Sequence, residues 1–136
     1  MTTALFTIGY EGLALDEFLA RLKASKIDRV IDIRELPLSR RRGFSKAPLA
    51  GALRDAGIDY VHLRSAGNPY RKEEDALVKY RVHIADATPV IEEVADAARG
   101  RRAALLCYEA DPATCHRSLI APHVAKHLKL RDVSNL

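Results

Sequence analysis

The side chains best suited to chemistry lie close together in one segment, CYEADPATCHRSLIA, residues 107–121. They are two cysteines, an acid, a histidine and an arginine: Cys107, Cys115, Glu109, His116 and Arg117. Thiolates act as nucleophiles and metal ligands, carboxyl and imidazole groups carry protons, and guanidinium groups bind phosphate. The segment could therefore serve acid–base catalysis, nucleophilic catalysis, a metal site or anion binding.

Nucleophilic catalysis requires a thiolate with a base within hydrogen-bond reach. Asp111 and Pro112 are a typical N-cap and first helical residue, so we predict a helix from Pro112 to about Leu128. Cys115 would then lie in the first turn, where a helix N-terminus favours the thiolate. Neighbouring residues on a helix point about 100° apart. A dyad of Cys115 with His116 is therefore disfavoured, and a structural role for Cys115 is the preferred interpretation.

The cysteine and histidine spacing does not favour a metal site. Cys107 and Cys115 lack the close Cys-x2-Cys spacing typical of zinc sites. His123 and His127 are four residues apart and could chelate a metal, but such residues commonly lie on a solvated helix face. We predict no bound metal, no cofactor and no disulfide between the two cysteines.

A second segment with chemical potential is rich in arginine. Its basic residues are Arg34, Arg40, Arg41, Arg42 and Lys46, against the single acid Glu35. The net charge of the whole chain is +4, so this local concentration is more informative than the total. Because the arginine fork suits phosphate and carboxylate, we expect Arg34, the Arg40–Arg42 loop and Arg117 to bind an anion. A charged loop that contributes only solubility is the alternative.

Composition limits the class of protein. The chain has 136 residues, which fits one domain with a real core. No apolar run approaches the roughly 18–20 residues that cross a bilayer, and the first residues do not resemble a secretory signal. Two cysteines do not make a disulfide framework. We expect a cytoplasmic protein with reduced thiols and no membrane association, and find no signal for its oligomeric state.

The elements that must position these residues alternate along the chain. Apolar runs predict strands at residues 4–9, 29–34, 58–63 and 103–107, with a short edge strand at 130–133. Helical spacing predicts helices near 15–22, 46–56, 72–86, 88–98 and 112–128, with Pro122 kinking or ending the last. This pattern predicts a single three-layer α/β domain over residues 1–136. Its sheet should be mainly parallel, of about five strands, with 103–107 central and helices on both faces.

In such a sheet, ligands bind beyond the carboxyl ends of the strands. The residues that follow each predicted strand come to that edge. They are Tyr10 and Glu11, Arg34 and the Arg40–Arg42 loop, residues 67–71, and Cys107 and Glu109. We expect one shared anion site, with Glu109 and His116 as acid–base residues. Glu109 should pair with an arginine when the site is empty, and neither Glu109 nor Arg117 should face the core.

Four stretches of the chain resemble the family known as domain of unknown function 488 (DUF 488). They are TIGYEG, VIDIRELPLSRRRGFSKAPL, GIDYVHLRSAGNP and ALLCYEADPATCHRSLIA, which together reach from Thr7 to Ala121. The CxE-x5-CHR pattern that begins at Cys107 is the most distinctive mark. The resemblance implies a small, mostly stand-alone prokaryotic α/β protein and names no activity. Many relatives carry a Gly-Gly-x-Arg-like loop where this chain has residues 65–69, which weakens the case for ligand contact there.

Two functions from different classes follow. One is an enzyme acting on a phosphate-bearing substrate, of the nucleotide or nucleic-acid class, with Glu109 or His116 moving a proton. The other is a non-catalytic nucleic-acid-binding module that grips the backbone with the Arg40–Arg42 loop. A backbone binder should lose affinity steeply between about 50 and 200 mM salt, whereas a small-ligand pocket should lose little.

Overall fold

Strands and helices alternate along the chain in a computed structural model that describes residues 2–136. The strands are β1 (Ala4–Gly9), β2 (Arg29–Asp32), β3 (Asp59–His62), β4 (Arg102–Cys107) and β5 (Ser134–Asn135). The helices are α1 (Leu15–Ala24), α2 (Lys46–Asp55), α3 (Ala76–Ala85), α4 (Thr88–Ala98) and α5 (Arg117–His127). Two short 3₁₀ turns, η1 (Arg64–Ala66) and η2 (Pro112–Thr114), complete the elements. None of the helices in this described range is long and apolar enough to span a membrane.

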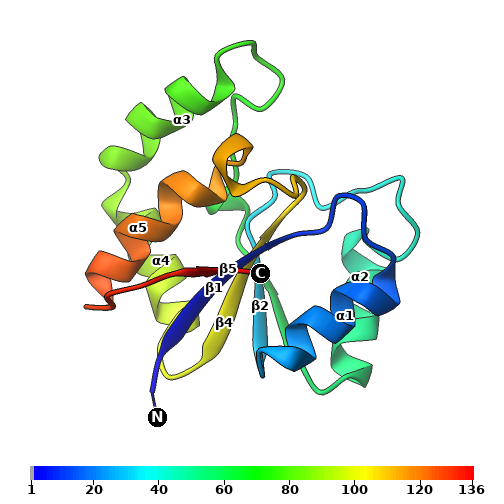
Figure 1. Cartoon of the computed structure of the whole chain (residues 1–136). Coiled ribbons are helices and arrows are strands. Elements are labelled where there is room, and N and C mark those ends of the chain that lie inside the picture. The colour runs from blue at the N-terminus through cyan, green and yellow to red at the C-terminus, as the bar shows by residue number, and fades with distance from the viewer. Residues whose placement is uncertain (1) are drawn as a thin grey trace.

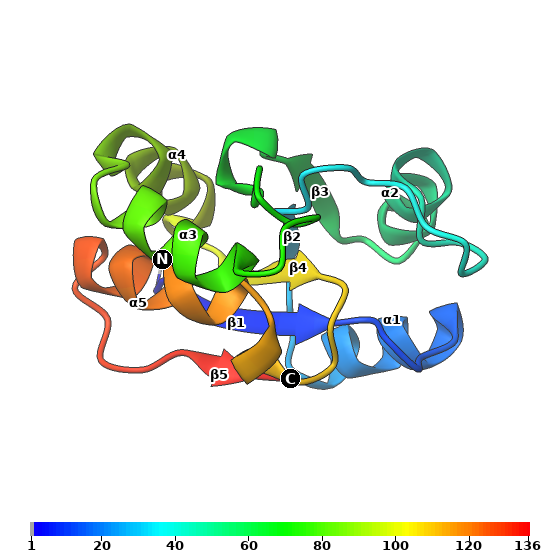
Figure 2. The same cartoon turned by 90° about the horizontal axis from the view of Figure 1, so that it is seen from above.

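The five strands form one parallel sheet in the order β3-β2-β4-β1-β5. β4 lies in the middle, as its unbroken apolar run predicts. The register aligns the strand ends, because Gly9 pairs with Cys107 and Asp32 pairs with both Leu106 and His62. The loops that follow β1, β2, β3 and β4 therefore leave the same edge, which faces the viewer in Figure 2.

Helices cover both faces of the sheet, which confirms the predicted three-layer α/β architecture (Figure 1). α1 and α2 lie on one face, and α3, α4 and α5 lie on the other. Successive β4 residues point to opposite faces, so Leu106 packs with Phe18 and Leu49, whereas Leu105 packs with the opposite cluster around Val94. Two apolar layers thus hold the sheet rigid beneath its loops.

The helix predicted from Pro112 is the main difference from the sequence prediction. Its first part is wrong, since η2 ends at Thr114, Cys115 is extended (φ −122°, ψ 144°) and α5 begins at Arg117. The Asp111 side chain caps only the short turn, accepting from the N–H of Ala113 at 2.9 Å. Cys115 consequently sits in a bend between two helical pieces, not within a helix.

Smaller boundary shifts occur elsewhere. α5 contains Pro122 and still continues to His127. The residues before α3 form turns, so that helix begins at Ala76 and not at residue 72. The edge strand is Ser134–Asn135, a few residues later than predicted, where it pairs with β1.

Candidate functional site

A cavity of about 590 Å³ opens at the carboxyl edge of the sheet, where the sequence predicts a crevice. We call it the edge cavity. Four loops line it: the turn after β1, residues 34–41 after β2, the loop and helix start at 68–77, and the β4–α5 connection. Of the predicted site residues, the lining includes Tyr10, Arg34, Arg40, Arg41, Cys107, Glu109 and His116. Glu11, Arg42, Cys115 and Arg117 are not part of the lining.

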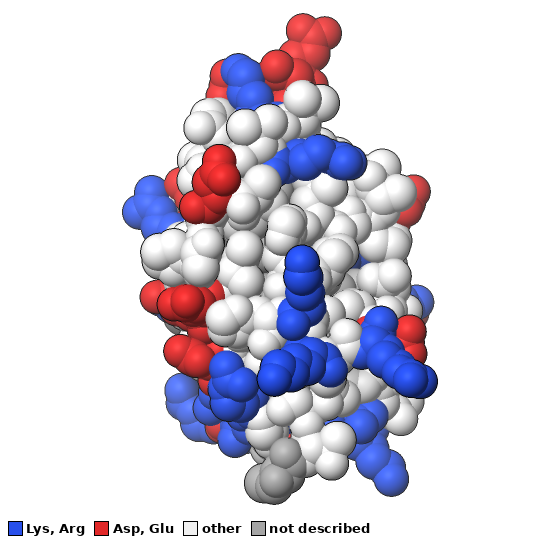
Figure 3. Space-filling model, turned by 90° about the vertical axis from the view of Figure 1, so that its left-hand side faces the viewer, with Lys and Arg blue, Asp and Glu red and all other residues white. Residues whose placement is uncertain are grey.

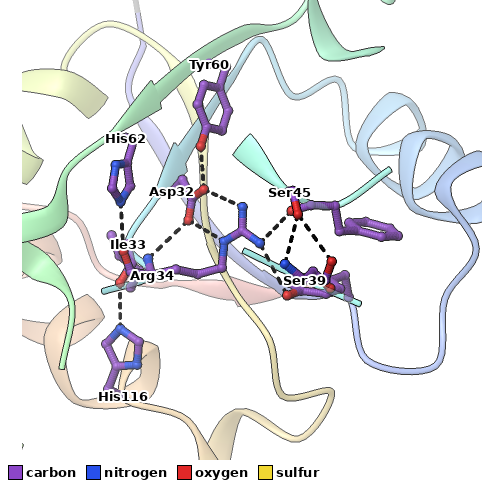
Figure 4. Close-up of polar contacts among 10 residues, drawn as sticks. Asp32, Ile33, Arg34, Ser39, Ser45, Tyr60, His62 and His116 are labelled. Atoms are coloured by element: carbon purple, nitrogen blue, oxygen red, sulfur yellow. Dashed lines mark hydrogen bonds and ion pairs between the residues drawn. The ribbon is translucent and has the colours of Figure 1, made fainter. Parts of the chain in front are cut away.

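Beneath the cavity lies a buried ion pair between Asp32 and Arg34 (Figure 4). The guanidinium donates to both carboxylate oxygens, Nε to Oδ1 at 2.8 Å and Nη2 to Oδ2 at 2.7 Å. Its remaining nitrogen donates to the Tyr10 hydroxyl at 3.2 Å and to the Phe44 carbonyl at 2.6 Å. Tyr60 donates its hydroxyl proton to the second Asp32 oxygen at 2.5 Å. The network ties β2, β3 and the 36–45 loop together.

This network has clear electrostatic consequences. Burial alone would lower the pKa of Arg34, but the hydrogen bonds and charge of Asp32 outweigh it and raise that pKa. Burial and the nearby Asp32 charge raise the pKa of Tyr60. Each guanidinium nitrogen of Arg34 already has an acceptor within the protein, so Arg34 positions the loop.

Two histidines approach the backbone after β2 from opposite sides (Figure 4). His62 Nε2 lies 2.8 Å from the Arg34 carbonyl, and His116 Nε2 lies 2.8 Å from the Ile33 carbonyl. A carbonyl only accepts, so each Nε2 carries a proton, and in a neutral imidazole Nδ1 is then the acceptor. Burial lowers the pKa of His116, and the charge of Arg117 adds to this effect. His116 is therefore a neutral imidazole at neutral pH.

Cys107 and Cys115 form a disulfide, so the prediction of unlinked, reduced thiols is wrong. The physical reason is the extended conformation of Cys115, which turns its side chain toward the end of β4. His116 Nδ1 lies 3.8 Å from the Cys107 sulfur and 3.9 Å from the Cys115 sulfur. The argument against a Cys115–His116 contact is wrong as well, because it assumed a helix through these residues.

Arg117 has a structural role in the interior of the domain. Its side chain is completely buried, and it donates to the carbonyls of Glu109 at 2.5 Å and Ala110 at 3.2 Å. The expectation that Arg117 would avoid the core is wrong. Burial lowers its pKa. Gly9 is required here, since a Cβ at Gly9 would lie 1.8 Å from the Glu109 carbonyl oxygen and 2.9 Å from an Arg117 nitrogen.

Glu109 is half-buried in the cavity wall. Its Oε2 lies 3.3 Å from the Cys107 sulfur. Among residues 2–136 no basic side chain forms an ion pair with it, so the expected pairing with an arginine is wrong. Glu11 instead braces this connection from outside, where its carboxylate accepts from the N–H of Ala110 at 3.0 Å.

The arginines on the cavity wall differ in whether the guanidinium has a hydrogen-bond acceptor within the protein. Arg41 donates through Nε and Nη2 to the Leu13 carbonyl. Arg40 and Arg71 are exposed, and within the described part of the chain neither guanidinium forms an ion pair or hydrogen bond. The strand-end rule placed residues 67–71 at this edge, but Arg71 was not predicted as an anion ligand. Asn68 holds that loop, accepting from the Tyr70 N–H and donating to the Ala76 carbonyl.

Large apolar side chains are exposed at the same cavity. Leu36, Leu38 and Tyr108 are 43%, 71% and 43% exposed, and all three belong to the lining. Tyr108 meets Tyr10 edge to face, with ring centroids 5.3 Å apart. No periodic signal marks isolated apolar residues in loops, so the sequence did not predict an apolar wall at this cavity.

Positive charge also occurs away from the edge cavity. Figure 3 shows the side of the molecule that lies on the left of Figure 1, where α3, α4 and α5 are found. Lysine and arginine side chains are spread over this face and interspersed with acidic and uncharged surface. A basic surface is therefore not restricted to the Arg40–Arg42 loop.

Comparison with known proteins identifies a family. The family model described as "Domain of unknown function DUF488" matches residues 14–124. No curated protein and no solved structure matches the chain.

Proposed function

The chain belongs to the DUF488 family, and from the geometry of its edge cavity we propose that it binds a phosphate-bearing ligand of the nucleotide class. Glu109 and His116 are the proposed acid–base residues of an enzyme acting on that ligand. The observation that carries the proposal is the joint presence, on one cavity, of unpaired arginines, exposed apolar side chains and two proton carriers.

The anionic half of the ligand is inferred from Arg40 and Arg71. They come from two different loops, line the same cavity and lack an internal partner within residues 2–136. A guanidinium donates up to five hydrogen bonds and binds phosphate through two of them at once. Arg41 and Arg34, by contrast, already donate to protein acceptors. Arg40 and Arg71 therefore supply the binding charge.

The apolar half is inferred from Leu36, Leu38 and Tyr108. Exposed large apolar residues that gather at one cavity mark a binding site more often than a free surface. Tyr108 offers an aromatic edge and face to a planar ring, and the leucines offer aliphatic contact. A nucleotide carries both a planar base and a phosphate, which fits a site of this volume and mixed chemistry.

The acid–base role is inferred from the protonation state of His116. Its Nε2–H donates to the Ile33 carbonyl, which leaves Nδ1, beside the Cys107 sulfur, as the nitrogen that can accept a proton. Glu109, half-buried beside Cys107, is the second group that could carry a proton to a bound ligand.

Calorimetric titration with inorganic phosphate, with adenosine monophosphate and with a single-stranded oligonucleotide tests the proposal. Adenosine monophosphate should bind more tightly than phosphate alone, because it also contacts the apolar wall. Arg71→Ala and Arg40→Ala should each weaken nucleotide binding at least about tenfold, the equivalent of one charge-assisted contact. Arg42→Ala is the matched control, since Arg42 lies in the same loop but outside the lining.

Two results would count against this function. Equal losses in Arg42→Ala and Arg71→Ala would show that general charge, and not the cavity, binds the anion. Oligonucleotide binding that falls steeply between about 50 and 200 mM salt, with no mononucleotide binding, would favour the non-catalytic nucleic-acid module instead.

A further inference from the structure

We propose that Cys107 and Cys115 are a redox-active pair, in which Cys107 exchanges with a disulfide or thiol that enters the edge cavity. The proposal goes beyond ligand binding and does not depend on a bound anion. It rests on two features: the position of each sulfur relative to the cavity, and the tautomer of His116.

The two cysteines have different access to the cavity. Both residues are buried, at 2% and 1% exposed, but the Cys107 side of the pair belongs to the cavity lining and Cys115 does not. An attacking thiol must meet its partner, and a resolving thiol need only reach the first sulfur. Cys107 is therefore the attacking residue and Cys115 the resolving residue.

His116 is placed to take the proton from either thiol. Its Nδ1 lies 3.8 Å from the Cys107 sulfur and 3.9 Å from the Cys115 sulfur, close to the reach of a sulfur hydrogen bond. The Ile33 carbonyl holds the proton on Nε2, so the lone pair of Nδ1 faces the sulfurs. A disulfide that served only as a staple would not need a base aimed at both of its sulfurs.

Other charged and titratable groups surround the two sulfurs and His116. Glu109 lies 3.3 Å from the Cys107 sulfur and disfavours its thiolate, whereas the charge of Arg117 opposes protonation of His116. The charge of Asp32 favours protonation of His116, and the Tyr80 ring packs on the imidazole with centroids 5.0 Å apart. Because Glu109 opposes the thiolate, transfer of the proton to His116 is the step that makes Cys107 reactive.

The exchange is balanced in two steps. The Cys107 thiol gives its proton to His116, and the resulting thiolate attacks one sulfur of an incoming disulfide. The S–S bond of that disulfide breaks, and its other sulfur takes the proton from His116 and leaves as a thiol. Cys115 then loses its proton to His116 and attacks the Cys107 sulfur, which releases the second thiol. The incoming disulfide is reduced to two thiols, and the dithiol is oxidised to the Cys107–Cys115 disulfide.

Reduction of the native protein by dithiothreitol, followed by acid quench, alkylation and mass spectrometry, tests the pair. The reagent carries no phosphate or base, so failure of the nucleotide-binding proposal would leave this result unaffected. The disulfide should be reduced in the folded protein at a rate that small amounts of urea do not raise. His116→Gln should slow reduction and reoxidation by oxidised dithiothreitol at least about tenfold, within the range of general-base effects. His127→Gln, exposed near the end of α5, should match the wild type.

Matched single-cysteine variants test the assigned roles. In Cys115→Ser the remaining Cys107 should react with iodoacetamide at least about tenfold faster than Cys115 does in Cys107→Ser. Any of three results would overturn the proposal: reduction only after global unfolding, faster labelling of Cys115, or unchanged exchange in His116→Gln. Stoichiometric zinc on the purified protein would do the same, because the two sulfurs and a His116 nitrogen lie within 4.8 Å of one another.

Discussion

The buried ion pair of Asp32 and Arg34, here called the buried centre, and the wall of the edge cavity both contain arginines. The two regions use these arginines for opposite purposes. In the buried centre each guanidinium nitrogen of Arg34 has an acceptor, and the pair is buried. On the wall, Arg40 and Arg71 are exposed, and among residues 2–136 no internal partner holds them. A guanidinium whose bonds are all satisfied fixes a loop, whereas one left unpaired is available to a ligand. Proximity in the sequence does not distinguish the two, since Arg34 and Arg40 are six residues apart.

The largest effect should come from breaking the buried centre. Asp32→Asn leaves the Arg34 charge buried without its counterion and should lower the free energy of unfolding by about 3–5 kcal/mol. Urea denaturation measures this. Asp132→Asn, an exposed control near the end of the chain, and Arg40→Ala, on the cavity wall, should each change it by less than about 0.5 kcal/mol. A similar loss in Arg40→Ala would remove the distinction between the two regions.

A smaller loss in the free energy of unfolding is expected at Arg117. Arg117 is buried like Arg34, but its guanidinium donates to backbone carbonyls and not to a carboxylate. Arg117→Met preserves much of the side-chain volume and leaves the Glu109 and Ala110 carbonyls without their donor. An unpaired buried acceptor costs about 1–3 kcal/mol. Because Ala110 is exposed and water can serve its carbonyl, only the Glu109 carbonyl counts, and we expect a loss of about 1–3 kcal/mol in thermal or urea unfolding. Arg131→Ala, exposed at the C-terminal end, is the control. An unchanged stability would mean that water replaces the guanidinium.

The smallest expected effect is a pH dependence of the free energy of unfolding that comes from His116. Burial lowers the pKa of His116 in the folded protein, so the unfolded chain binds the proton more readily. Stability that is complete above about pH 6.5 should therefore decline as the pH falls below that value. His116→Gln should reduce this decline between pH 7 and pH 5 in urea titrations, and His127→Gln should not. An equal decline in both variants would place the responsible group elsewhere.

Much of the fold could be predicted because strand and helix patterns are local. The first strand was predicted at its observed bounds, Ala4–Gly9, and the continuous apolar run at 103–107 indicated the central strand. The candidate site was predicted only in outline. The strand-end rule brought Tyr10, Arg40 and Glu109 to one cavity, yet it could not show that Arg117 turns inward. Burial of an arginine depends on carbonyls from another element, which no local pattern records.

The sequence by itself determined the α/β class, the parallel sheet and the edge at which polar residues collect, since periodicity and strand-end position follow from the chain alone. The tertiary structure decided which of those residues remain available. It joined Cys107 to Cys115, faced His116 toward both sulfurs and enclosed Arg34 among its acceptors. Such contacts depend on the bend at Cys115 and on the meeting of distant loops. Their geometry exists only when the whole sheet has brought its strand ends together.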